Sequence, residues 1–122
     1  MTTMTHKKLE EYILAKPGAK LDYPFGEEVA VYKVVDKMFA LIQEKKEPVS
    51  ISLKCDPELA KHLRQKYDEV QAGYHLNKKH WNTIVVTGQL DEREIFDLIN
   101  HSYDLVIASL GKDAPKNLKN NE

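Results

Sequence analysis

The chain has 122 residues, of which 42% are hydrophobic and 30% charged, and its formal net charge is −1. This length suits one domain with a single core and is too short for two. A net charge near zero gives no strong long-range attraction to a polyanion, so any affinity for nucleic acid must come from a local basic patch. The single cysteine, Cys55, excludes an internal disulfide. With neither a signal sequence nor an apolar run of bilayer length, we expect a cytoplasmic protein.

The chain opens with a pattern typical of a short amphipathic helix. Thr5 is a suitable N-cap for a helix that carries Leu9 and Ile13 on one face, and Pro17 closes the segment. Residues 21–26 are expected to form an extended or turning connection, because a residue that precedes proline is pushed away from helical geometry.

Three β-branched or aromatic stretches follow and predict strands at residues 29–35, 38–44 and 49–54. The breaks between them, at residues 36–37 and 45–48, are short. Such spacing indicates an antiparallel meander.

The second half predicts a helix, a strand and a longer helix. Asp56 and Pro57 form a strong helix start, and that helix should run to about Tyr67 with Leu59 and Leu63 on its buried side. A strand is expected at residues 81–87. The last helix should begin with Asp91 and Glu94 as a capping box and end at Gly111. Its apolar stripe is expected to comprise Ile95, Ile99, Ser102, Tyr103, Val106 and Leu110.

This order of elements predicts an α+β domain in which helices pack on an antiparallel sheet. We expect one such domain over residues 1–111. Residues 112–122 contain one sizeable apolar residue, Leu118, and are predicted to be a disordered tail.

The most distinctive segment is the polar run at residues 73–83, which precedes the predicted strand. It combines lysines, histidines, amides and aromatic rings. Lysines meet phosphates, amides reach base or sugar edges, and flat rings stack on bases, so the run favours nucleic-acid binding. Within residues 45–81, eight lysine and arginine residues face five acidic ones, which is a modest local excess in the same direction.

Three segments together resemble the MmcQ/YjbR family of small bacterial proteins: AKPGA at 15–19, PELA at 57–60 and HLNKKHWNT at 75–83. The resemblance extends from the first predicted helix to about Leu110. It implies a fold similar to the frataxin/CyaY sandwich and a double-wing DNA-binding arrangement. The wings come from the resemblance alone.

Several residues of the run have a structural reading beside the functional one. Trp81, at a strand start, is more typical of a core anchor than of a base-stacking platform. Tyr74 is the better stacking candidate, with packing as its alternative. Asn82 either reads a base edge or holds the turn into the strand. His75 and His80 contact a polyanion or fix the loop, and they match no zinc-ligand pattern.

Signatures of catalysis are missing from the sequence. The glycines do not cluster into a phosphate-binding loop, and no G-x-S-x-G motif is present. We therefore expect no enzyme activity, no metal and no cofactor.

The sequence-based hypothesis is a monomeric DNA-binding protein with no membrane association. Its alternative is a module that binds a protein partner or a small ligand without physiological DNA binding. The residues expected to contact DNA are Tyr74, His75, Asn77, Lys78, Lys79, His80, Lys45, Lys46 and Lys54.

Overall fold

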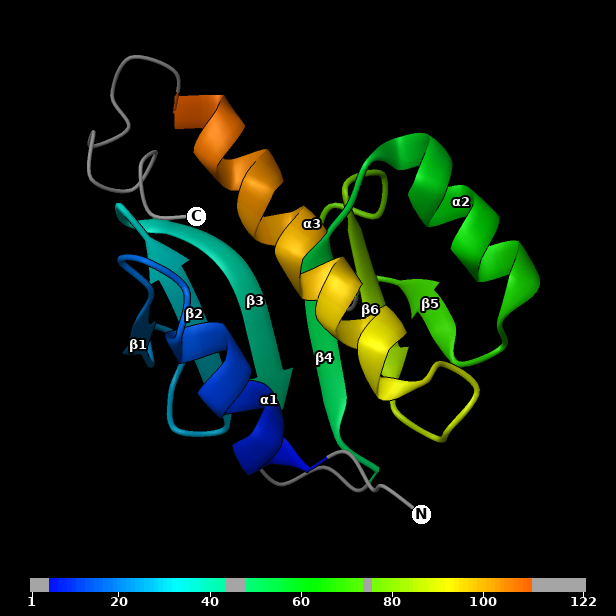
Figure 1. Ribbon diagram of the computed structural model, residues 1–122, viewed down its shortest axis with the longest axis horizontal. Helices are drawn as coiled ribbons and strands as arrows, with labels where there is room; N and C mark the ends of the chain where they lie inside the picture. Colours follow the sequence, from blue (N-terminus) through cyan, green and yellow to red (C-terminus); the bar gives the residue numbers. More distant parts are fainter. Residues whose placement is uncertain (1–4, 44–47, 74–75, 111–122) are drawn as a thin grey trace.

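The computed structural model describes residues 5–43, 48–73 and 76–110, which form a layer of sheet and a layer of helices (Figure 1). Within these ranges the sheet has six strands, in the order β1-β2-β3-β4-β6-β5, and all its pairings are antiparallel. The predicted α+β fold is confirmed. The elements are α1 (His6–Leu14), β1 (Lys20–Asp22), β2 (Val29–Val34), β3 (Lys37–Gln43), β4 (Ser50–Lys54), α2 (Pro57–Lys66), β5 (Val70–Ala72), β6 (Trp81–Val85) and α3 (Glu92–Leu110).

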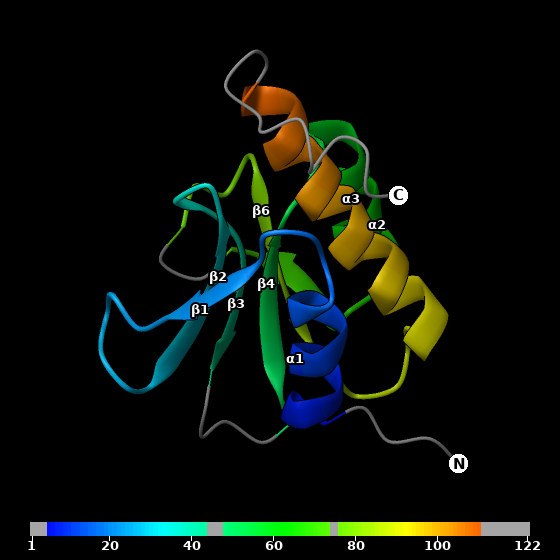
Figure 2. The ribbon, with the colours of Figure 1, turned by 60° about the vertical axis from the view of Figure 1, so that its left-hand side comes forward.

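The helices lie on one side of the sheet, as the turned view shows (Figure 2). The loop between β1 and β2 projects to the other side, and so does the segment that leads into β6. We call the side of the sheet that faces away from the helices the open face. This division places the ends of several strands and two loops on a surface that the helices do not cover.

The predicted meander is present as β2, β3 and β4, each paired with the next. The chain then passes through α2 and returns as β5 at the edge of the sheet. β6 follows and pairs with both β4 and β5. Because β6 lies between them, residues 76–80, which lead into it, are placed at the end of a central strand.

Two strands were not predicted. Residues 21–26 were expected to be a connection, yet Leu21 and Asp22 belong to β1, which pairs with β2. β5 was missed as well. Both strands have three residues, and every residue of β1 is exposed, so neither carries an alternating apolar pattern long enough to detect.

The turn between β2 and β3 differs from the prediction by one residue. It consists of Val35 and Asp36, whose φ angles are +49° and +63°. Positive φ at both positions is the geometry of a type I′ hairpin turn, which suits the twist of the two strands. Val35 is an unusual residue for it, because a β-branched side chain is strained in the left-handed region.

The predicted helix starts are confirmed. Thr5 accepts a hydrogen bond from Lys8 N, and Asp56 accepts from the amides of α2's first turn. The capping box is reciprocal: Asp91 N donates to Glu94 Oε1 at 3.2 Å, and Glu94 N donates to Asp91 Oδ1 at 2.8 Å. The buried stripe of α3 consists of the six predicted residues.

The apolar side chains form two clusters on opposite faces of the sheet. The main core lies between the sheet and the helices, and Leu9, Tyr32, Ile51 and Ile99 are among its fully buried members. The smaller cluster lies on the open face and comprises Val31, Leu41 and Trp81, with Val29, Met38 and Leu76 packed against it. The open face is therefore partly apolar at its centre.

α2 contributes less to the core than expected. Leu59 and Leu63 are only partly buried, and Ala60 is the residue of this helix that is fully buried. The predicted tail and Gly111 lie outside the described residues. Across the ranges that the structure describes, no helix combines the length and apolar character needed to cross a bilayer.

Candidate functional site

The nine predicted DNA-contacting residues divide into two groups. Tyr74, His75, Lys45 and Lys46 lie outside the described residues. The other five lie at one end of the sheet, four in the connection between β5 and β6 and one at the end of β4. They are Asn77, Lys78, Lys79, His80 and Lys54.

Asn77 organises the turn that leads into β6. Its side-chain Oδ1 accepts a hydrogen bond from Lys79 N at 2.9 Å. Its carbonyl oxygen accepts from His80 N at 3.2 Å and from Trp81 N at 3.0 Å. An asparagine that bonds the backbone two residues ahead is a common turn-forming arrangement. The Asn77 side chain thus fixes the loop backbone.

Lys78 ties the same loop to its surroundings. Its Nζ donates to Gly73 O at 3.3 Å, across the start of the loop. Its carbonyl oxygen accepts from Arg64 Nη1 of α2 at 3.2 Å. Lys78 therefore has a structural role that the sequence did not indicate.

Lys79 and His80 present their side chains to solvent. Both residues are exposed, and neither side chain makes a hydrogen bond or ion pair with another residue that the structure describes. Their backbone is held by the Asn77 turn. The loop thus carries a cationic and a titratable side chain on a fixed backbone.

Close packing between Gly73 and Trp81 holds the two ends of the loop together. Gly73 N donates to Trp81 O at 2.9 Å. A Cβ at position 73 would come within 2.7 Å of Trp81 Cβ, which is closer than side-chain atoms can approach without moving one of them. Glycine is required here for a close approach of backbone.

Trp81 is buried, as predicted for a core anchor. Its exposed fraction is 8%, and it packs with Val31 and Leu41 on the open face. Leu76 packs against this cluster. The ring of Trp81 is therefore not available to stack on a base.

Asn82 does not read a base edge. It is 3% exposed and belongs to the helix-facing side of β6, where its Nδ2 donates to Ala60 O at 3.2 Å. The alternation of the strand explains this position, because Trp81 and Thr83 point to the open face and Asn82 points between them in the opposite direction.

Lys54 lies beside the loop. It pairs with Trp81 in the register of β4 and β6. The next residue is Cys55, whose backbone N–H donates to His80 O at 2.8 Å. The alternation of β4 places Lys54 on the open face, since its neighbour Leu53 belongs to the main core. Lys54 and the loop therefore form one surface.

Two further lysines extend this row across the sheet, and sequence reasoning missed them. Lys20 and Lys33 are partners in the pairing of β1 with β2 and lie on the open face. Lys33 Nζ forms an ion pair with Asp22 Oδ2 at 3.2 Å. The hydrogen bond from Tyr23 N, and then the one from Lys33, lower the pKa of Asp22. The alternation of residues 29–35 would have placed Lys33 opposite the core; the missed strand β1 hid Lys20.

In the part of the chain that the structure describes, no three His, Cys, Asp or Glu residues gather in a way that could hold a metal ion. Cys55 is a buried free thiol. Burial, with a smaller contribution from the Asp56 carboxylate, raises the pKa of Cys55 to about 11. A thiol with this pKa is protonated at neutral pH and is a poor nucleophile.

Comparison with known proteins gives a consistent set of relatives. A family model described as YjbR matches residues 14–105. The protein YjbR of Escherichia coli K12 is 36% identical over 113 residues, which cover 93% of this chain and 96% of that protein. YbdF of Escherichia coli O157:H7 is 35% identical and covers 93% of each chain. Both are named as uncharacterised proteins, so their names supply no activity.

Solved structures of similar proteins share the fold. The crystal structure of the Deinococcus radiodurans protein DR2400, a DUF419 domain, has a TM-score of 0.87 and 35% identity, covering 94% of this chain and 88% of that one. A crystal structure of a Pseudomonas syringae protein has a TM-score of 0.73 and 32% identity, covering 84% of this chain and 98% of that one.

Proposed function

We propose, from the premise that this chain belongs to the YjbR family, that it is a DNA-binding protein that contacts the phosphate backbone through residues 76–80 and Lys54. It acts as a monomer in the cytoplasm and catalyses no reaction. The observation that carries the proposal is the pair Lys79 and His80, which are exposed on a loop whose backbone is fixed.

A fixed loop favours binding because less conformational freedom is lost when the ligand arrives. The backbone of the loop is held by the turn at Asn77, by the contact of Lys78 with Arg64, and by the close packing of Gly73 on Trp81. Lysine contacts to phosphate need little geometric precision beyond placement of the charge. The loop supplies that placement.

The row of lysines on the open face offers further contacts to the phosphate backbone of DNA that is bound at the loop. Lys54 belongs to β4, and Lys33 and Lys20 belong to β2 and β1. Neighbouring strands are about 4.8 Å apart, so these ammonium groups are distributed across several strand spacings. Lys33 is partly neutralised by Asp22, which leaves Lys54 and Lys20 as the stronger candidates.

The proposed mode of binding is independent of base sequence. Trp81 and Asn82, the two residues at the start of β6 that offered stacking or edge recognition, are buried. Phosphate contacts set affinity and position but carry no direct sequence information. We therefore expect similar affinities for duplexes of unrelated sequence.

The test is binding of a labelled duplex and a labelled single strand, followed by fluorescence anisotropy over a range of salt concentrations. Affinity should fall with salt, with a slope that reflects a few phosphate contacts. The Lys79→Glu variant should bind duplex at least about fivefold more weakly at low salt, because it replaces an attraction with a repulsion.

Lys7→Glu is the matched control, since it makes the same change in net charge at an exposed position on α1, in the helix layer. Its affinity should stay within about twofold of the wild type. Equal losses in the two variants would show that only net charge matters, and the proposed surface would then be wrong.

A second candidate function, binding of a basic protein segment, rests on the loop between β1 and β2. Phe25 is 62% exposed and Tyr23 is 42% exposed. Three exposed acidic residues accompany them, Asp22, Glu27 and Glu28. An exposed aromatic surface with acidic neighbours suits a partner that is apolar and positively charged. If a lysine-rich peptide binds the wild type and does not bind the Phe25→Asp variant, the result favours this function over DNA binding.

A further inference from the structure

The helix α2 adjoins the loop at residues 76–80 through two printed contacts along one of its flanks. Arg64 Nη1 donates to Lys78 O at 3.2 Å, so the guanidinium group of Arg64 reaches the loop. The start of the helix lies beside the loop as well, because Cys55 N, just before α2, donates to His80 O at 2.8 Å. The proposed DNA-binding surface therefore borders on α2.

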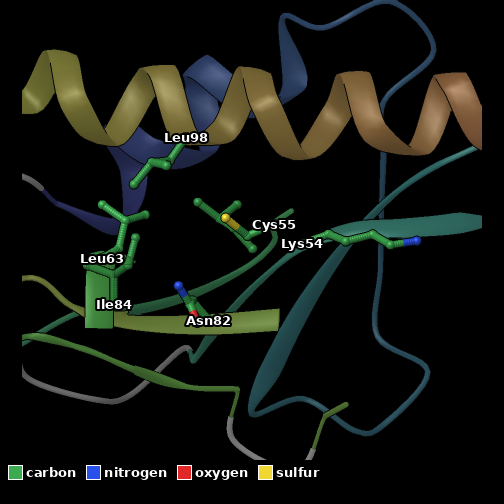
Figure 3. A pocket seen from close by; sticks show the side chains of 7 residues that line it. Lys54, Cys55, Leu63, Asn82, Ile84 and Leu98 are labelled. Atoms are coloured by element: carbon green, nitrogen blue, oxygen red, sulfur yellow. The ribbon is translucent and has the colours of Figure 1, made fainter. Parts of the chain in front are cut away.

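The buried residues of α2 fix which of its sides faces the loop. Leu63 lies with Leu98 of α3 and Ile84 of β6 around a small pocket between the helices and the sheet (Figure 3). Ala60 is fully buried. Successive residues of an α-helix are about 100° apart, so Leu63, Ala60 and Arg64 follow one another around the axis in that order. Arg64 thus lies on the flank of α2 that is turned away from α3.

Lys61 belongs to the same flank as Arg64. Residues three apart on a helix are separated by about 60° around the axis and are neighbours on its surface. The Lys61 side chain is exposed and makes no hydrogen bond or ion pair with a residue that the structure describes. Lys66 is also exposed, but it lies about 200° from Arg64 and therefore on the opposite flank.

The guanidinium group of Arg64 is held in place and still has donors to offer. Its Nε donates to Ala60 O at 3.3 Å, and its Nη1 donates to Lys78 O. A guanidinium group has five N–H donors, and the other three have no acceptor among the described residues. Arginine binds phosphate oxygens with paired hydrogen bonds, so an arginine that is already positioned suits this ligand.

Positive charge predominates where this flank meets the loop. The cations are Lys61, Arg64, Lys78 and Lys79, and the carboxylates are those of Asp56 and Glu58. The Asp56 carboxylate accepts hydrogen bonds from the amides of Glu58 and Leu59, which cap the helix. Four cations against two carboxylates leave a local excess that attracts a polyanion.

We infer that the flank of α2 formed by Lys61 and Arg64 is a second phosphate-binding position, next to the one at residues 76–80. The inference rests on the proposed function and extends its surface. Lys54 lies on the other side of the loop, and its amine extends away from the packing of α2 on α3 (Figure 3). The loop is then the middle of the contact with DNA, between Lys54 and α2.

The test compares Lys61→Gln with Lys66→Gln, which remove the same charge from exposed positions on opposite flanks of one helix. Binding of a labelled duplex is followed by fluorescence anisotropy over a range of salt concentrations. For Lys61→Gln the slope of log K against log salt should become shallower by about 0.9, the value of one phosphate contact, and binding at low salt should weaken at least about threefold. Lys66→Gln should keep the slope of the wild type.

Arg64 is tested without substitution, because it also holds the loop. The side-chain Nε–H signal of Arg64 in the NMR spectrum of the isotope-labelled chain should shift when a short duplex is added at low salt. An unchanged slope in Lys61→Gln, equal changes of slope in the two variants, or an unmoved Arg64 signal would overturn the inference and leave binding by the loop intact. No binding of duplex by the wild type at low salt would overturn the proposed function together with it.

Discussion

Ser102 is a single side chain that joins three elements. Its Oγ donates to Phe39 O of β3 at 2.5 Å and accepts from Lys54 N of β4 at 2.9 Å, and the residue itself is fully buried on α3. The direct pairing of β3 with β4 stops at Ala40 and Leu53. The hydroxyl thus satisfies two backbone groups that the strands leave unpaired at this end.

Ser102→Ala should lower the free energy of unfolding by about 1–3 kcal/mol, because a buried carbonyl and a buried amide lose their partner. Urea unfolding measures the change. Ser109→Ala is the control: Ser109 is exposed, and its hydroxyl bonds to no described residue other than Val106, within α3, so its removal should cost almost nothing. Similar stability of the two variants would contradict the bridging role of Ser102.

Cys55 makes stability depend on pH in the alkaline range. Its pKa rises from 9.0 in a free thiol to about 11 in the folded chain, chiefly through burial. Above pH 9.0 the thiol of the unfolded chain ionises while that of the folded chain stays neutral. The stability that the folded chain has relative to the unfolded one is therefore unaffected by this thiol below pH 9.0 and decreases as pH approaches 11. The shift corresponds to on the order of 2 kcal/mol.

The measurement is the unfolding free energy of the wild type minus that of Cys55→Ala, followed across this pH window. The variant keeps every other titrating group, so the difference isolates the thiol. The free energy of unfolding of the wild type minus that of Cys55→Ala should fall as pH rises through this window. A difference that does not change with pH would show that Cys55 ionises as easily in the folded chain as in the unfolded one.

At the scale of elements, the sequence predicted helices better than strands. The starts of α1, α2 and α3 each follow from a capping residue, and the buried stripe of α3 follows from its spacing of three and four residues. β1 and β5 could not be predicted in this way, because three residues carry too little periodicity. Their pairing with β2 and β6 comes from tertiary contact instead.

The hairpin of β2 and β3 shows how a local preference can be overridden. Val35 has a φ of +49°, although a valine is strained at this angle. Its side chain is 41% exposed. A two-residue loop between twisted strands requires positive φ at both positions, so the pairing on either side determines the geometry. Sequence reasoning placed the break one residue later because valine indicates strand.

Val35→Asn should stabilise the protein by about 0.5–1 kcal/mol, since asparagine tolerates the left-handed region better than a β-branched residue. Thermal unfolding should show a rise in Tm of a few degrees. Val35→Thr keeps a branched side chain at the same backbone angle and should give no such gain. If both variants melt together, the strain assigned to Val35 is absent.

At the scale of the whole molecule, the sequence predicted which segment would carry the candidate site but not the structural role of each residue in it. Residues 76–80 of the polar run lie at one end of the sheet beside Lys54, as a basic surface requires. Asn77 and Lys78, however, are engaged in holding the loop, and Asn82 is turned to the opposite face. Hydrogen bonding within a loop and the face of the sheet on which a residue lies both depend on the fold, so they could not be predicted from the residue types in this segment.

The central claim is that the loop at residues 76–80, together with Lys54, contacts DNA. The most direct measurement is the amide chemical-shift change of the isotope-labelled protein on addition of a short duplex at low salt. We predict that the changes concentrate at Lys79, His80 and Lys54, diminish with added salt, and leave the exposed side of α3 unaffected. No changes at low salt, or changes centred on the helix layer, would contradict the account.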